Sequence, residues 1–438
     1  MLNHPPVSLN DPMHTPTDPH CVRYQDQVLS SAFQPIYSLA HRRVVGHEAL
    51  LRVKDAQGAS VPPLSVFSEE HHPLELLTVD RLTRSLHMRN FVAQSPKQMG
   101  WLFLNFNPQV ISTGNSDHFN FTRELFRLYD LAPDRVVVEI LEHRINDEQM
   151  ILDAVDFYRG LGCLIAVDDF GAGQSNFDRV WNLDADIVKL DRSLVVQAAI
   201  NPRALPFLAS ITTMLHQAGK LVLLEGIETE DHARIALNAD VDFVQGFYFA
   251  RPSPFLSDTA AISEKIEKVS CALLHQETEE GERQTREISG YVNRFREVLS
   301  NFDLKSRGSQ NYKAFMFVDY LRNPGVLRWF ELDENGIQVG RNINKASLET
   351  TLDDFFSPLG DARGADWSRR DYFRRAMRYF GKVQVTGPYF SLPDAHTCVT
   401  LSIALRRNDG VVRVYCSDLV WHGPARPELI TNTCASDG

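Results

Sequence analysis

The sequence predicts an α/β protein: a TIM-like (β/α)8 barrel, then a helical linker, then an α+β domain. Three observations predict this order. Between residues 30 and 252, short apolar runs alternate with amphipathic stretches about eight times, as in βαβ units with a parallel sheet. From residue 255 the apolar residues recur every three or four positions, which is typical of a helix. From residue 313 alternating runs and glycine turns follow, which is typical of antiparallel strands.

The barrel is predicted for residues 23–254. Its expected strands are 32–37, 44–52, 101–105, 136–139, 163–167, 187–191, 221–225 and 243–246. Its expected helices are 74–93, 119–129, 147–159, 204–217 and 231–237, with a short segment at 177–181. Eight strands in roughly 220 residues favour a closed barrel over an open sheet. Residues 1–22 are rich in Pro, His, Asp and Asn without periodicity, and we expect a disordered tail.

Composition excludes several classes of function. A net charge of -11 and a pI of about 5.8 disfavour a non-specific binder of nucleic acid or acidic membranes. The six cysteines contain no Cys-x-x-Cys pair, so neither a zinc site nor a disulfide framework is indicated. The sequence has no apolar stretch of the roughly 20 residues that a membrane span needs, and no signal-peptide core. We therefore expect a cytoplasmic protein.

Polar residues stand at the ends of nearly all the apolar runs. They are Glu48, Asn105, Glu139, Asp168, Asp169, Lys189, Glu225 and Gln245. Because the carboxyl ends of barrel strands share one face, we expect these side chains to converge on one pocket. Neighbouring strand residues point to opposite faces, so Asp168 and Asp169 converge only if the strand ends and bends there.

This set of residue types predicts a metal site. Carboxylates and an amide oxygen are ligands suited to Mg²⁺ or Mn²⁺. Five carboxylates carry more charge than one divalent ion balances, so two ions sharing a carboxylate are expected. Two such ions, roughly 3.5 to 4 Å apart, generate a hydroxide and stabilise an in-line phosphodiester displacement. Lys189 could orient or deprotonate the attacking water, and Arg52 offers a fork for a phosphate oxygen.

Seven short motifs follow one another in residues 33–252: GHEALLR at 46–52, FLN at 103–105, EILE at 139–142, DDFGAG at 168–173, KLD at 189–191, EGIE at 225–228 and QGF at 245–247. In this order they resemble the EAL domain (barrel of the EAL type), a family of cyclic di-GMP-specific phosphodiesterases. The family's fold is a TIM-like barrel whose first strand runs antiparallel. One tripeptide would be weak evidence, whereas seven motifs in order are specific.

The resemblance implies a role for each matching residue. Glu48, Asn105, Glu139 and Asp168 would hold one metal, and Asp168, Asp169 and Glu225 the second. Catalytic positions would be Glu48, Lys189 with the nucleophilic water, its neighbour Asp191, Gln245 at the water and phosphate end, and Glu142, which steadies the loop after the paired aspartates. Substrate contacts would come from Gln34, Arg52, Asp169 and Gln245. The implied cofactors are two Mg²⁺ or Mn²⁺ ions, with Ca²⁺ as an inhibitory ion.

Three functions follow from these expectations. The first is hydrolysis of cyclic di-GMP to linear pGpG by a two-metal mechanism, regulated by the C-terminal domain. The alternative is a cyclic di-GMP receptor with little turnover, and the third is a scaffold without nucleotide affinity. Departures from the family pattern at Leu141 and at 174–176 remove no metal ligand but affect the loop after the aspartates. The expected assembly is a homodimer, without DNA, RNA or a membrane span.

Residues 255–303 predict a helical linker. Ile262, Ile266, Val269, Ile288 and Val292 belong to a narrow apolar seam. Such a seam fits a stalk that pairs two chains, or a helix packed on its own barrel.

Residues 304–438 predict a PAS- or Cache-like sensor or dimerisation domain. The expected strands are 315–318, 326–330, 336–339, 384–389, 398–403 and 411–419, with a helix at 370–379 and hairpin turns at 333–336 and 407–410. Five residues could line a pocket for an unidentified small ligand, or could be core and surface pairs. They are Trp367, Arg370, Tyr372, Tyr389 and Asp418.

Overall fold

A computed structural model gives the structure of the chain. It describes residues 20–67, 73–94, 100–106, 115–141, 148–172, 177–201, 204–257, 259–304, 318–344, 362–391 and 396–421. The chain divides into two compact units, Met1–Leu273 and Leu274–Gly438. The predicted tail at 1–22 lies outside the described residues except for its last three. The unit boundary falls inside the long helix that the sequence predicts as a linker.

The first unit is the predicted barrel. Its strands are β1 (Cys21–Tyr24), β2 (Gln27–Ser38), β3 (Arg43–Lys54), β4 (Ser60–Val61), β5 (Trp101–Phe106), β6 (Val136–Leu141), β7 (Leu164–Phe170), β8 (Ile187–Leu190), β9 (Leu221–Leu224) and β10 (Phe243–Val244). The order β2-β10-β9-β8-β7-β6-β5-β3 closes because β3 also pairs with β2. Eight strands therefore form a closed barrel, as predicted.

The first barrel strand, β2, runs against its neighbours. It pairs antiparallel with both β3 and β10, whereas β3 with β5 and the pairs from β5 round to β10 are parallel. This confirms the expectation of an antiparallel first strand. The carboxyl ends of the seven parallel strands thus share one face of the barrel.

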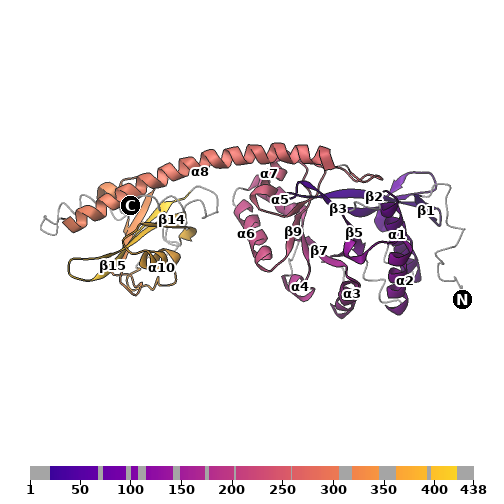
Figure 1. Ribbon diagram of the computed structural model, residues 1–438, viewed down its shortest axis with the longest axis horizontal. Coiled ribbons are helices and arrows are strands. Elements are labelled where there is room, and N and C mark those ends of the chain that lie inside the picture. Colours follow the sequence, from indigo (N-terminus) through magenta and orange to yellow (C-terminus); the bar gives the residue numbers. More distant parts are fainter. Residues whose placement is uncertain are drawn as a thin grey trace. The chain divides into compact units, whose positions relative to one another are not determined.

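Helices surround the barrel strands (Figure 1). They are α1 (Pro73–Gln94), α2 (Asn115–Leu128), α3 (Glu148–Leu161), α4 (Phe177–Asn182), α5 (Arg192–Ile200), α6 (Ala204–Gln217) and α7 (Glu230–Asn238). Single 3₁₀ turns lie at Pro63–Val66 and Pro133–Arg135. The apolar sides of the α-helices pack on the strands in two clusters. The strands contribute Phe33, Leu104 and Ile165 to one cluster and Tyr37, Val188 and Leu224 to the other. The sequence analysis did not predict α5.

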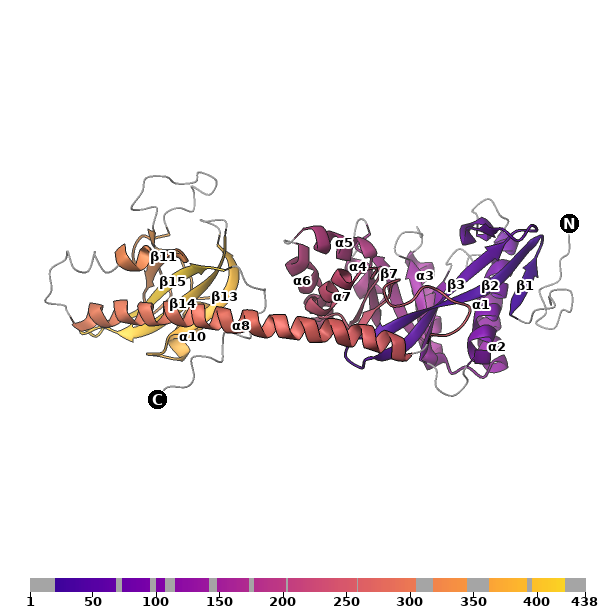
Figure 2. The ribbon, with the colours of Figure 1, turned by 90° about the horizontal axis from the view of Figure 1, so that it is seen from above.

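One continuous helix, α8 (Thr259–Leu304), follows the barrel (Figure 2). Its first part belongs to the barrel unit, where Ile262, Ile266 and Val269 join the barrel's apolar core. Its last part belongs to the second unit, where Ile288 and Phe295 join another core. Of the two predicted arrangements, the first part of α8 therefore shows the one in which the helix packs on its own barrel.

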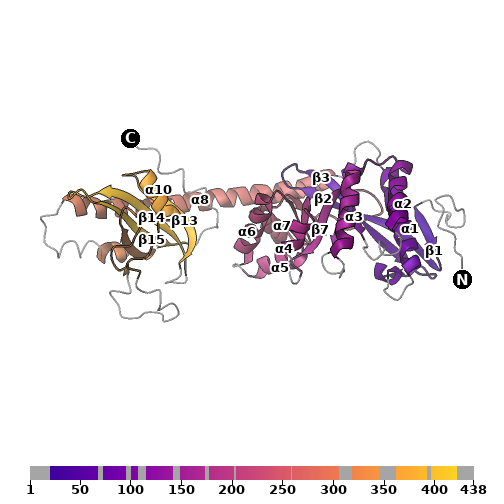
Figure 3. The same cartoon turned by 90° about the horizontal axis from the view of Figure 1, so that it is seen from below.

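The second unit contains a five-stranded antiparallel sheet. Its strands are β11 (Val326–Leu332), β12 (Ile343–Asn344), β13 (Gln384–Ser391), β14 (His396–Arg406) and β15 (Val412–Val420), in the order β12-β11-β15-β14-β13. Helix α10 (Asp371–Arg378) lies beside β13 and β14 (Figure 3). Trp329 faces the core shared with α8, whereas Phe330 faces the core shared with α10. The sheet therefore lies between the end of α8 and α10.

Two predicted strands of the second unit are wrong in part. Val318 begins a helical turn, and 315–317 lies outside the described residues. The predicted strand at 336–339 makes only isolated bridges, Leu332 with Gln338 and Ile337 with Asp366. Backbone bonds still cross the hairpin turn, from the Asp333 amide to the Ile337 carbonyl and from the Val339 amide to the Glu331 carbonyl, both at 2.9 Å, but they do not extend into a strand. None of the described helices is both long and apolar enough to cross a bilayer.

Two buried histidines predict that acid destabilises the barrel. Burial and then Arg52 lower the pKa of His87 to about 3, and burial lowers the pKa of His47 to about 4. Below about pH 6.5 each histidine is protonated in the unfolded chain but stays neutral in the folded one. The free energy of unfolding therefore decreases by about 1.4 kcal/mol for each histidine and each pH unit below that value, until the pH reaches the pKa of the folded state.

We expect the free energy of unfolding in urea to fall between pH 7.5 and pH 5, with about 2 kcal/mol of the loss due to His87. His87→Gln, neutral at both pH values, should lose about that much less than the wild type. An equal loss in both proteins would contradict this account.

Candidate functional site

Lys189 lies among carboxylates at the carboxyl ends of the barrel strands. Its Nζ atom is 2.7 Å from Oε1 of Glu139, 2.7 Å from Oε1 of Glu225 and 2.9 Å from Oδ1 of Asp168. Oε2 of Glu48 is 4.0 Å away. We call Glu48, Glu139, Asp168, Asp169 and Glu225 the acidic centre. Lys189 is 1% exposed and Glu139 0%, so water screens these charges little.

Two amides connect further strands to the acidic centre. Asn105, near the end of β5, donates from Nδ2 to Oε1 of Glu48 at 3.1 Å. Gln245, which follows β10, donates from Nε2 to Oε2 of Glu48 at 2.7 Å. Strands β3, β5, β6, β7 and β8 and the residues after β9 and β10 thus meet at one place, as the pattern of strand-terminal polar residues predicts.

Asp168 and Asp169 converge because the backbone of β7 is irregular. Asp169 has φ 57, a left-handed conformation that non-glycine residues rarely adopt. The pairing of β7 with β8 shifts register between Val167 and Phe170 at the same point. Carboxylate oxygens of Asp168, Asp169 and Glu225 all lie within 4.8 Å of one another. This is the bend that the adjacent aspartates required.

Gly226 is the residue that lets the chain turn directly after Glu225. Its φ of +69 favours glycine, and a Cβ there would lie 2.3 Å from Cγ of Arg192. The Arg192 guanidinium extends to Glu228, with Nη2 3.0 Å from Oε2. The EGIE motif therefore supplies one site carboxylate, one obligatory glycine and one ion-pair partner.

The charges of the site shift one another's pKa values. Burial, with Glu48 and Asp168 adding to it and Lys189 opposing it, raises the pKa of Glu139 well above its usual range. Burial, opposed by Lys189, raises the pKa of Glu225 to about 8. Burial alone would lower the pKa of Lys189, but its four carboxylate neighbours raise it well above its usual value. The ammonium form of Lys189 is therefore favoured.

The acidic centre fits a divalent cation. Its donors are carboxylate and amide oxygens, the ligands that Mg²⁺ and Mn²⁺ prefer. Oε2 of Glu139 and Oε1 of Gln245 are buried and have no hydrogen-bond partner within the described part of the chain. Buried oxygens normally have partners, so unpaired ones beside three clustered carboxylates indicate room for a cation.

Three further predicted site residues, Gln34, Arg52 and Asp191, are described by the structure, and their side chains have other partners. Gln34 is opposite Glu48 in the β2–β3 register and donates to the Ala250 carbonyl at 3.4 Å. Arg52 donates to the Leu51 carbonyl; burial lowers its pKa and Glu48 opposes that shift. Asp191 caps α5 by accepting from the Ser193 amide at 2.9 Å. Glu142 and the loop at 174–176 lie outside the described residues, and the Leu141 side chain is also outside them.

The five residues singled out in the second unit come together. The Arg370 guanidinium lies 5.9 Å from the Trp367 ring and 5.7 Å from the Tyr389 ring, which is 6.2 Å from the Tyr372 ring. Tyr389 donates to Asp418 at 3.0 Å.

Asp418 is fully buried and already has several partners. Besides Tyr389, it accepts from Nε of Arg328 at 2.6 Å and from Oγ1 of Thr400 at 2.7 Å. A ligand amine at Asp418 would have to displace one of them, so the small-ligand pocket stays a prediction.

The sequence analysis missed two arginines that form buried ion pairs. Arg328 pairs with Asp418, and Arg84 pairs with Asp80 within α1. A signal existed for Arg328, because it lies two residues before the buried Phe330 in β11, and residues two apart in a strand point to the same face. For Arg84 the signal was its four-residue spacing from Asp80 on the apolar side of α1.

The fold and the site define a class: a closed (β/α)8 barrel with one antiparallel strand and an acidic centre at the strand ends. The chain belongs to the EAL domain family, whose sequence model matches residues 23–252. It is 22% identical over 343 residues to YkuI of Bacillus subtilis, described as an uncharacterized EAL-domain protein, covering 78% of this chain and 82% of YkuI. It is 27% identical over 225 residues to the cyclic di-GMP phosphodiesterase RocR of Pseudomonas aeruginosa, covering 51% of this chain.

A solved structure extends the comparison to the fold of both units. The crystal structure of Bacillus subtilis YkuI, in complex with cyclic di-GMP and calcium, has a TM-score of 0.76 and 21% identity, and covers 90% of this chain and 97% of that one. Several relatives are longer than the match: this chain spans 57% of RocR and 32% of an uncharacterized Azorhizobium caulinodans protein that is 27% identical over 242 residues. The chain therefore spans less than two thirds of the length of these two relatives.

Proposed function

We propose that this chain hydrolyses cyclic di-GMP to linear pGpG with two Mg²⁺ or Mn²⁺ ions. The observation that carries the proposal is the acidic centre itself, which gathers five carboxylates with Asn105 and Gln245 at the strand ends. RocR is named a cyclic di-GMP phosphodiesterase, and YkuI was crystallised with cyclic di-GMP. In this proposal Glu48, Asn105, Glu139 and Asp168 hold one ion, and Asp168, Asp169 and Glu225 the other.

The proposed reaction is a hydrolytic phosphodiester cleavage. Water attacks phosphorus, the bond to one ribose 3′ oxygen breaks, and that oxygen takes a proton, so a linear dinucleotide with a 5′-phosphate is released. Two divalent ions activate water and offset charge on the phosphoryl oxygens when they are bound. Lys189, charged among its carboxylates, donates hydrogen bonds to the attacking water or a phosphoryl oxygen. Arg52 and Gln34 hold the nucleotide, and the C-terminal unit regulates the rate.

The test is turnover by the purified full chain. Cyclic di-GMP is incubated with the protein in Mg²⁺ or Mn²⁺, and pGpG is separated by chromatography. The negative control is Glu48→Gln, which keeps the size of the side chain and removes its charge. Its rate of hydrolysis should be at least a hundredfold lower than that of the wild type. Tight nucleotide binding without pGpG from the wild type would place the chain among receptors. Neither binding nor turnover would indicate a scaffold.

A further inference from the structure

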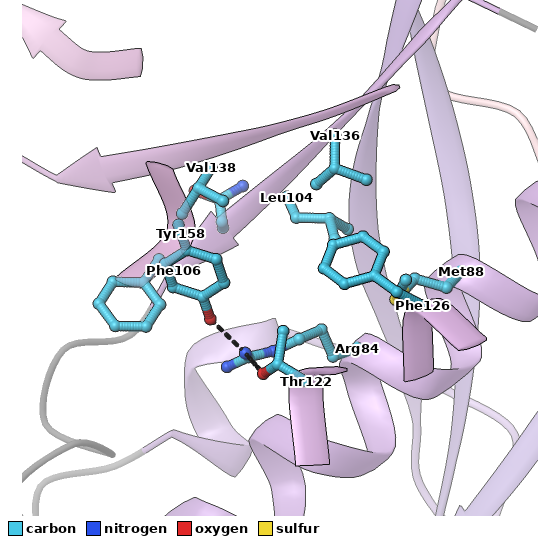
Figure 4. Close-up of a pocket in the computed structure, with 10 residues that line it drawn as sticks. Arg84, Met88, Leu104, Phe106, Thr122, Phe126, Val136, Val138 and Tyr158 are labelled. Carbon is cyan, nitrogen blue, oxygen red and sulfur yellow. Dashed lines mark hydrogen bonds between the residues drawn. The ribbon is translucent and has the colours of Figure 1, made fainter. Parts of the chain in front are cut away.

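A narrow cavity lies behind β5, between the barrel wall and three helices (Figure 4). Arg84 of α1, Thr122 of α2 and Tyr158 of α3 line it from the helix side. Asn105 and Phe106 line it from β5. The proposed metal ligand Asn105 therefore belongs to a strand end whose other side rests on this cavity.

The Arg84 guanidinium connects the three helices. Its Nη1 donates to the Tyr158 hydroxyl at 2.5 Å and to Oγ1 of Thr122 at 3.0 Å, as the dashed lines in Figure 4 show. Its Nη2 donates to Asp80 one helical turn earlier. Arg84 is 7% exposed, so these bonds form where water competes little. These bonds leave from two nitrogens of one rigid, planar group, and the single nitrogen of a lysine does not reproduce that geometry.

Phe106 transmits this arrangement to the strand end. Its ring centroid is 5.9 Å from the Arg84 guanidinium and 5.5 Å from the Tyr158 ring, in an edge-to-face contact. Phe106 directly follows Asn105, and adjacent strand residues point to opposite faces. While Phe106 is held on the cavity side, Asn105 faces the acidic centre, where it donates to Glu48. A shift of the Phe106 ring would move Asn105 through one peptide unit.

We propose that Arg84 is a positioning residue for Asn105: it fixes Phe106 and thereby the place of the Asn105 amide in the metal site. This inference rests on the proposed function for the role of Asn105. Outer groups that orient a metal ligand commonly change metal affinity by about 10- to 100-fold when they are removed.

A double-mutant cycle on Mn²⁺ affinity tests the proposal. Arg84→Lys, Asn105→Ala and the double variant are titrated with Mn²⁺ by calorimetry. Arg84→Lys should weaken Mn²⁺ binding by about 10-fold or more in the wild-type background. In the Asn105→Ala background it should change the affinity less than twofold, because coupled residues are not additive. Equal effects of Arg84→Lys in both backgrounds would overturn the proposal.

Arg81→Lys is the matched control. Arg81 is a buried arginine on the same helix, stacked over Phe121 of α2, and it is not among the described residues that line the cavity. The Arg81→Lys variant should bind Mn²⁺ within twofold of the wild-type affinity. If it lost as much Mn²⁺ affinity as Arg84→Lys, any damage to α1 would suffice, and the proposal would be overturned. If Arg84→Lys does not fold, Tyr158→Phe replaces it in the cycle with the same expected result.

The affinities are measured without nucleotide, which separates this inference from the proposed function. If Mn²⁺ binding shows the predicted coupling but cyclic di-GMP is not hydrolysed, the positioning role stands and the phosphodiesterase proposal fails. If Asn105→Ala keeps wild-type Mn²⁺ affinity, the positioning role is wrong whatever the turnover of the wild type.

Discussion

Replacing Lys189 with alanine is expected to slow hydrolysis of cyclic di-GMP by about a hundredfold to a thousandfold. Three carboxylate oxygens lie 2.7 to 2.9 Å from its ammonium, which is the charged donor nearest to the proposed metal ligands among the described residues. In the proposed mechanism, the variant loses the group that orients the water and offsets charge on the phosphoryl oxygens. Initial rates of pGpG formation at saturating Mn²⁺ measure the effect.

The control for this prediction is Lys220→Ala. Lys220 is also ion-paired, with Nζ 2.5 Å from Oδ1 of Asp184, but it directly precedes β9 at the amino end of the strand. Groups at that face of a barrel serve stability and not catalysis, so its rate should equal that of the wild type. A Lys189→Ala rate within tenfold of the wild type would contradict the role given to Lys189.

Replacing Arg328 with methionine is expected to destabilise the second unit by about 3 to 5 kcal/mol. The change leaves the carboxylate of Asp418, which is 0% exposed, without its cationic partner. Removing both charges together is far less costly than removing one, so Arg328→Met with Asp418→Asn should recover most of the loss. Calorimetry of the full chain measures both variants, with Mn²⁺ used to identify the barrel transition.

This result also decides between two roles of the aromatic and charged cluster in the second unit. A large loss that the double variant repairs means that Arg328 and Asp418 form a structural ion pair. A loss below about 1 kcal/mol in the single variant would contradict a buried structural pair and would favour the predicted ligand pocket.

Most of the acidic centre can be located from the sequence because the geometry of a barrel determines which strand ends lie close together. Each parallel strand ends on the same face, so a polar residue at the end of an apolar run is placed without knowledge of the loops. The alternation of side chains along a strand predicted that Asp168 and Asp169 needed a bend, and Asp169 adopts φ 57 there. Local pattern and global fold agree at these positions.

The missed features depend on contacts between distant segments. Arg84 bonds to Tyr158, 74 positions away, and Arg328 bonds to Asp418, 90 positions away. A charged residue in a helix or strand indicates a solvent-facing position unless its partner is known. The four-residue spacing points to Asp80 as one partner of Arg84, but no local period supplies Tyr158, nor Asp418 as the partner of Arg328. Helix α5 was missed because Asp191, which caps it, was interpreted as a catalytic acid or a salt-bridge partner and not as a helix cap.

The most direct test of the central claim is to count the metal ions in the acidic centre. Crystals of the chain grown with Mn²⁺ and a slowly hydrolysed analogue of cyclic di-GMP would be measured at the manganese absorption edge. The account predicts two anomalous peaks that share the Asp168 carboxylate, with Glu139 at one ion and Glu225 at the other, and Lys189 beside them. A single peak, or none within reach of Asp168, would contradict the two-metal site.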